Sequence, residues 1–157
     1  PTPPTTPRPT PATPATPKPR TAADLSVTII AVGVIDQYTG AFVSRAPISP
    51  NEVSAVQFDI KNVGGTTSGT YYFTAQLPTS QPYTYSSPQQ SPLAPGAHVV
   101  STLRFTQGVS GTFSVQVSGD SKTGNNYASQ WIYGSYNQGY QNYNYPYQQY
   151  PQYPYGY

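Results

Sequence analysis

A single histidine limits the acid–base chemistry that this chain can perform near neutral pH. The 157 residues contain one histidine, five acidic side chains and no cysteine, which excludes thiolate chemistry, disulfides and cysteine-based metal sites. His98 follows a Pro-Gly turn and enters a predicted strand on its solvent side, with no Ser-His-Asp pattern nearby. Asp36 and Glu52 are far apart in the sequence. We therefore interpret His98 as a surface residue and predict no catalytic site.

The densest group of oxygen donors is formed by Asp120, Asn125 and Asn126. Carboxylate and amide oxygens bind Ca²⁺, but this segment has only one carboxylate, and Lys122 lies within it. Turns in which Asp and Asn side chains bond the local backbone explain these residues better. The sequence therefore predicts a structural turn here, with no metal and no cofactor.

Composition divides the chain into three parts. Residues 1–21 contain only Pro, Thr, Ala, Arg and Lys, which predicts an extended Thr/Pro-rich linker. Residues 22–132 hold nearly all the aliphatic side chains, and residues 133–157 form an uncharged Tyr/Gln/Asn/Pro-rich low-complexity tail. Of the formal net charge of +2, the basic excess belongs to the linker, through Arg8, Lys18 and Arg20. Because no basic face is expected in the middle part, nucleic acid is not a predicted partner.

Alternating apolar and polar residues in the middle part predict short strands. The clearest case is residues 56–61, where Val56, Phe58 and Ile60 alternate with polar or charged neighbours. Comparable runs separated by turn residues cover 25–35, 71–77, 83–85, 98–105, 113–118 and 127–133. About seven strands in ~110 residues are typical of an antiparallel β-sandwich with Greek-key connections. The predicted fold class is therefore all-β, an immunoglobulin-like sandwich flanked by disordered tails.

Several motifs resemble one family of sandwich domains. These are DLSVT at 24–28, VQFDIKNVGGTTSG at 56–69, LAPG at 93–96, and GTFSVQV at 111–117 followed by Asp120 and the Asn125-Asn126 pair. Together they resemble the cell-adhesion-related CARDB domains of bacterial and archaeal surface proteins. The resemblance implies an immunoglobulin-like sandwich used outside the cell for spacing, display or adhesion, with no catalytic residues. The long first strand and the loop 36–50 exceed the family pattern.

The tail combines many aromatic rings with a complete lack of charge. Such sequences self-associate through tyrosine rings and amide side chains, whereas ordinary solvating tails carry charge. We therefore predict self-association, or adhesion to glycans or other cell-envelope surfaces, with a purely solvating tail as the simpler interpretation. The candidate contact residues are the tail tyrosines Tyr136, Tyr140, Tyr143, Tyr145, Tyr147, Tyr150, Tyr153, Tyr155 and Tyr157.

The leading functional hypothesis is a non-enzymatic adhesion or display module, extracellular or at the cell surface, raised by its linker from a membrane anchor upstream. One alternative is a carbohydrate-binding module that uses exposed aromatic residues. Trp131 is expected to close the core, with glycan stacking as its other interpretation; the tyrosines considered with it are Tyr71, Tyr72, Tyr83 and Tyr85. A further alternative is an exported filament subunit that lends segment 24–36 to a neighbour.

Overall fold

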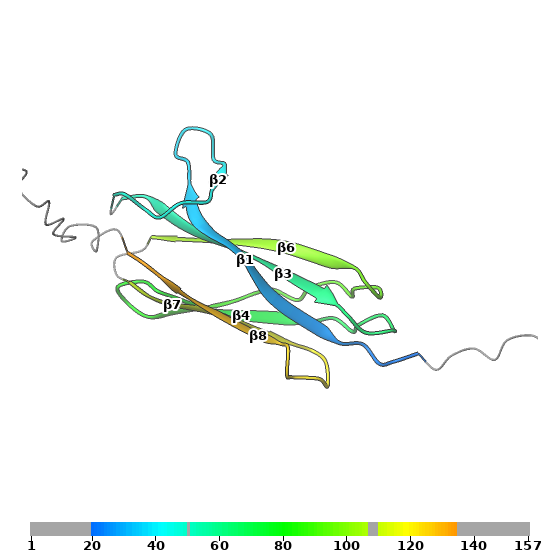
Figure 1. Cartoon of the computed structure of the whole chain (residues 1–157). Helices are drawn as coiled ribbons and strands as arrows, with labels where there is room; N and C mark the ends of the chain where they lie inside the picture. Colours follow the sequence, from blue (N-terminus) through cyan, green and yellow to red (C-terminus); the bar gives the residue numbers. More distant parts are fainter. Residues whose placement is uncertain (1–19, 50, 107–109, 135–157) are drawn as a thin grey trace, which may run out of the picture.

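The fold consists of two four-stranded antiparallel sheets packed face to face (Figure 1). The computed structural model describes residues 20–49, 51–106 and 110–134. One sheet has the order β2-β1-β3-β6 and the other β5-β4-β7-β8. The strands are β1 Leu25–Ile35, β2 Phe42–Val43, β3 Val53–Asn62, β4 Tyr72–Leu77, β5 Tyr83–Ser86, β6 His98–Thr106, β7 Gly111–Ser118 and β8 Tyr127–Ile132.

This arrangement confirms the predicted all-β sandwich. The crossing connections, with β1 paired to β3 and β3 to β6 while β4 joins the opposite sheet, are those expected of an immunoglobulin-like fold. Within the described ranges, no helix is long and apolar enough to cross a membrane. The disorder predicted for the linker and the tail concerns residues that fall almost wholly outside the described ranges.

The first strand changes its inward face partway along its length. Leu25 and Val27 point into the core, and a register shift against β3 then follows between Ile29 and Ala31. Ile30, which has no partner in β3 at this shift, is exposed; beyond it the parity is reversed, so that Val34 is buried. A bulge inserts one residue and re-aims the side chains that follow it. The bulge thereby allows apolar side chains on both sides of it to face the same core, although the alternation along β1 is broken.

The loop that exceeded the family pattern contains an additional strand, β2, which pairs with the end of β1 at Val34 and Ile35. Alternation could not predict a strand of two residues. The close approach depends on Gly33, because a Cβ there would lie 2.1 Å from the carbonyl oxygen of Val43. A side chain at this position would therefore push β2 away from β1.

The core lies between the sheets and is centred on Phe58, which is fully buried. Its ring meets Phe73 edge-on with centroids 5.2 Å apart, and the ring of Phe113 lies at 6.3 Å. The core position expected for Trp131 was wrong: its side chain is 53% exposed, and the neighbouring Ile132 is buried instead. Alternation along β8 turns Ala128 and Ile132 inward, and Trp131 therefore faces solvent.

One buried polar side chain, Asn62 at the end of β3, joins three separate segments. Its Nδ2 donates to the carbonyl oxygens of Thr66 and Leu93, both at 2.8 Å. Its Oδ1 accepts from the backbone N–H of Gly64 at 3.0 Å and of Asp24 at 3.3 Å. Every hydrogen-bonding direction of this amide is thus used inside the fold. Asn62 therefore connects the segment before β1 to the turns that follow β3 and precede β6.

Candidate binding face

The outer face of the sheet β5-β4-β7-β8 carries no charged side chain. None of the chain's Asp, Glu, Lys or Arg residues lies in these four strands. Alternation turns hydroxyl, amide and aromatic groups outward, and all of them are exposed except Ser114, which is half-buried. We call this surface the uncharged face. Its members are Tyr72, Thr74, Gln76, Thr84, Ser86, Thr112, Ser114, Gln116, Ser118, Tyr127, Ser129 and Trp131.

The strand register places two of the three rings of this face on the edge strand β8 and the polar groups on the strands beside it. Gln116 on β7 lies opposite Thr74 on β4 and opposite Tyr127 on β8. Trp131 stands opposite Thr112, and Tyr72 lies at the start of β4. Tyr127 is 57% exposed and Trp131 53%. Such a surface can stack on flat apolar groups and exchange hydrogen bonds with uncharged partners.

The opposite sheet differs sharply in charge. Its outer face carries Asp59, Lys61, His98 and Arg104 on β3 and β6. His98 lies on this surface, as expected from the sequence, with its Nδ1 2.9 Å from Oδ1 of Asp59. The two sides of the sandwich therefore offer different chemistry, because the charge of the described strands is confined to one of them.

The exposed rings of β8 continue to the end of the described chain. Trp131 and Tyr133 line a hollow of about 250 Å³ together with Val32 and Pro47 from the segments around β2. The backbone N–H of Gly134 then donates to Oγ of Ser110 at 2.9 Å. The last described residues are therefore held against the sandwich beside the uncharged face. The tail tyrosines proposed as contact residues lie outside the described residues.

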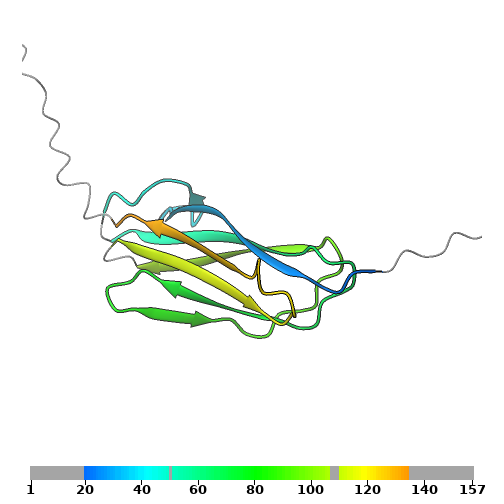
Figure 2. The same ribbon diagram turned by 60° about the horizontal axis from the view of Figure 1, so that its bottom comes forward.

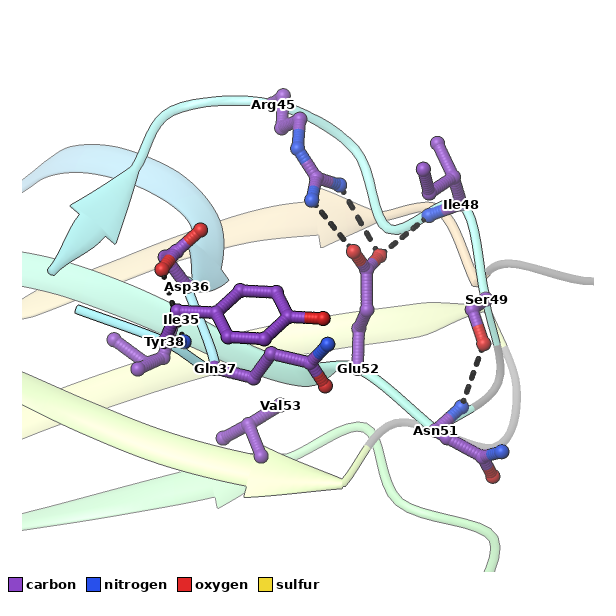
Figure 3. Close-up of a pocket in the computed structure, with 10 residues that line it drawn as sticks. All are labelled: Ile35, Asp36, Gln37, Tyr38, Arg45, Ile48, Ser49, Asn51, Glu52 and Val53. Atoms are coloured by element: carbon purple, nitrogen blue, oxygen red, sulfur yellow. Dashed lines mark hydrogen bonds and ion pairs between the residues drawn. The ribbon is translucent and has the colours of Figure 1, made fainter. Parts of the chain in front are cut away.

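A second hollow, of about 350 Å³, lies beneath the loop that carries β2 (Figure 3). Both Asp36 and Glu52 line it, although they are far apart in the sequence. Glu52 makes two contacts with the Arg45 guanidinium, at 2.5 and 3.1 Å, and accepts from the N–H of Ile48 at 2.7 Å. Asp36 accepts from the N–H of Thr39 at 2.7 Å. These bonds hold the loop closed, so the two carboxylates do not form a paired acid site.

The same bonds predict how this loop responds to acid. The hydrogen bond from Arg45, followed by that from Ile48, lowers the pKa of Glu52 from 4.5 to about 2. Because the folded pKa is the lower one, the stabilisation is complete above pH 4.5 and is lost as the pH falls towards 2. We expect Glu52→Gln to lower the melting temperature at pH 7 and to match the wild type near pH 2. If the melting temperatures of Glu52→Gln and the wild type differed by the same amount at pH 7 and near pH 2, this assignment would be contradicted.

The turn before β8 has the predicted structural role, but its Asp and Asn side chains bond the segment around the start of β1 and one another, where the sequence predicted bonds to the local backbone. Asp120 accepts from the N–H of Leu25 and from Nδ2 of Asn126 at 2.6 Å. Asn125 donates to Asp24 at 2.9 Å through its side chain, and its carbonyl oxygen accepts from the N–H of Val27 at 3.0 Å. Across the described part of the chain, no group of three or more His, Cys, Asp or Glu is arranged to hold a metal.

The tyrosines considered with Trp131 separate into three environments. Tyr71 is buried in the core, and Tyr85 packs on Phe73 with ring centroids 5.8 Å apart. Tyr72 lies on the uncharged face, whereas Tyr83, 56% exposed, lies across from Leu77 on the inner side of β5. Sequence reasoning overlooked both Tyr127 and the uncharged face. The only available signal was that four separate segments lack charged residues. These segments form one uncharged surface because they lie in the same sheet.

Comparisons with known proteins describe the fold. No family model matches the chain, and no curated protein matches it. Among solved structures, it is similar to the CARDB domain of the PF1109 protein from Pyrococcus furiosus, in complex with di-metal ions, at 18% identity and a TM-score of 0.44. That match covers 71% of this chain and 88% of the other.

Two glucosidases are also similar in part. One is a β-glucosidase from Erythrobacter marinus, at 15% identity and a TM-score of 0.39. The other is a β-D-glucoside glucohydrolase from Trichoderma reesei, at 22% identity and a TM-score of 0.31. Each match covers 71% of this chain but only 15% and 19%, respectively, of the enzyme. The solved CARDB domain belongs to the family that the motifs of this chain resemble. The sandwich fold of the chain itself follows from its two antiparallel sheets.

Proposed function

We propose that this chain is a non-enzymatic module of the cell surface or the extracellular space, in which the sandwich carries a cohesive tail. The supporting observation is the course of the chain: the described segment before β1 and the described segment after β8 lie at opposite ends of the sandwich (Figures 1 and 2). A linker that enters at one end and a tail that leaves at the other suit a display module. The linker then holds the sandwich away from its anchor.

The acid–base groups support a role other than catalysis. Asp24 contacts Lys122 and Asn125, and Asp59 contacts His98. The remaining acidic side chains hold the loop of β2 and the turn before β8, as described above. Each carboxylate in the chain therefore has a structural partner within the fold.

The tail supplies attachment through many weak contacts. Residues 133–157 contain ten tyrosines and no charged side chain. A tyrosine offers a flat apolar ring and a hydroxyl that both donates and accepts. Single contacts of this kind are weak, but several on one chain act together once the first has formed. We infer that the tail causes copies of this protein to cohere.

Removal of the tail tests this function. We expect residues 1–157 to form assemblies that grow with concentration in sedimentation velocity, and a chain ending at Gly134 to stay monomeric. The named core side chains lie between Leu25 and Ile132, so the shortened chain retains its core. Assembly of both chains would assign cohesion to the sandwich, and two monomeric chains would refute cohesion through the tail.

Carbohydrate binding is a second candidate, and one observation favours it. Trp131, Tyr127 and Tyr72 are exposed on the same uncharged face, where neutral sugars can stack and form hydrogen bonds. Binding of this kind would persist without the tail. The filament alternative has less support, because β1 pairs with β3 along its whole length in the same chain.

A further inference from the structure

We propose that the uncharged face is the docking surface for residues 135–157 of a second copy of this chain. This inference rests on the proposed function and names the surface that receives the tail. It replaces cohesion between tails with cohesion between the tail of one molecule and the sandwich of another. Every copy then carries one donor and one acceptor surface, so assembly can continue beyond a pair.

The tail and the uncharged face match in their chemistry. Residues 135–157 contain only tyrosine, glutamine, asparagine, proline, glycine and serine. The uncharged face presents serine, threonine, glutamine, tyrosine and tryptophan. No member of this face carries a formal charge, and Arg45, which lines the hollow beside Trp131, is already paired with Glu52. Covering the opposite face would bury Asp59, Lys61 and Arg104. The hydroxyl and amide groups can pair across the contact, which offsets their loss of water.

The tail begins close to the uncharged face in the sequence. It follows Gly134, two residues beyond β8, which is the edge strand of the sheet that bears this face. Fully extended, residues 135–157 span about 75 Å, roughly twice the length of β1. This length suffices to cross a neighbouring sandwich. Docking on the tail's own face would require the chain to reverse direction after β8, which docking on a neighbour does not.

Two aromatic side chains of β8 are placed to serve as anchors for the tail. Trp131 and Tyr127 lie four residues apart on one strand, with their side chains on the same face and each more than half exposed. Tryptophan and tyrosine supply a large share of the binding energy in protein interfaces. The polar side chains of β7 and β4 lie beside them, with Gln116 opposite Tyr127 and Thr74 beyond it. We therefore expect tail rings to stack on Tyr127 and Trp131.

The experiment separates an acceptor face from cohesion between tails. A fluorescently labelled chain ending at Gly134 is mixed with unlabelled full-length protein, and its co-sedimentation with the assemblies is measured. The labelled chain has the face but lacks the tail, so docking predicts that it is recruited. The labelled double variant Tyr127→Ala/Trp131→Ala should need a roughly tenfold higher concentration of full-length protein for equal recruitment.

Tyr83→Ala is the matched control, because Tyr83 lies on the other edge strand of this sheet with nearly the same exposure but outside the uncharged face. We expect its recruitment to equal that of the unsubstituted shortened chain. Failure of the labelled chain to join full-length assemblies would overturn the docking proposal, while cohesion through the tail would stand. If Tyr83→Ala reduced recruitment as much as the double variant does, the docking proposal would also be overturned, because the uncharged face would not be the contact surface.

Failure of the proposed function has a different signature. If full-length protein stays monomeric and both it and the shortened chain are retained on an insoluble neutral polysaccharide, the occupant of the face is a glycan. The Tyr127→Ala/Trp131→Ala variant would then lose retention. That result would overturn both the docking of the tail and the cohesive function.

Discussion

Replacing Asn62 with alanine should lower the free energy of unfolding by about 3 kcal/mol, because four hydrogen bonds are lost where water cannot replace them. The amide is fully buried and serves Asp24, Gly64, Thr66 and Leu93. Each net bond contributes roughly 0.5–1.5 kcal/mol, and groups left unpaired in the interior add to the loss. Urea unfolding followed by circular dichroism measures the change.

The effect should extend to the ends of the segments that Asn62 joins. Gly64 packs against the segment before β1 so closely that a Cβ would lie 2.2 Å from the carbonyl oxygen of Ala22. Loss of the bond to Gly64 therefore frees that turn and the entry to β1 together. Asn51→Ala is the control, because Asn51 is exposed in a loop. A loss below about 1 kcal/mol for Asn62→Ala would show that water takes over the four bonds.

Phe58→Ala should cost about 3–5 kcal/mol, whereas Trp131→Ala should cost less than about 1 kcal/mol although it removes the larger side chain. Phe58 is fully buried and contacts the rings of Phe73 and Phe113. Its removal leaves a cavity that rigid neighbours cannot fill. Trp131 is 53% exposed, so about half of its surface is already in water and solvent can fill the space that its removal leaves. Urea midpoints for the two variants provide the comparison.

Fluorescence offers an independent check on Trp131, which is the single tryptophan of the chain. In the native sandwich its emission should lie close to that of the unfolded chain, and acrylamide should quench it readily. A strongly blue-shifted and protected emission would place the indole in the core. Such a result would also remove one of the two anchors proposed for the docking of the tail.

The separation of charge between the two sheets has a consequence for assembly. Contacts through the uncharged face and the tail involve no formal charge, and their strength should therefore depend little on salt. The outer face of the opposite sheet, which carries Asp59, Lys61 and His98, stays in water and favours solubility. A module with one hydrated and one uncharged side can thus associate in a preferred orientation without precipitating.

The sequence by itself determined the strands and their class. Alternation over 56–61 gave the direction of Phe58 into the core, because a strand turns successive side chains to opposite faces. Turn residues marked where the strands end, and composition alone separated the linker and the tail from the sandwich. Each of these properties is set by residues that are close together in the chain, so a local sequence pattern is enough to predict it.

Only the tertiary structure decided which of two apolar neighbours is buried and which surfaces are continuous. Trp131 and Ile132 are adjacent, and alternation permits either one to face the core; the pairing of β8 with β7 turned Ile132 inward. The bulge in β1 and two of the four partners of Asn62, Asp24 and Leu93, likewise depend on segments distant in the chain. The uncharged face exists because β4, β5, β7 and β8 meet in one sheet. Such long-range pairing leaves no periodic signal in any single segment, which is why the sequence alone did not reveal this face.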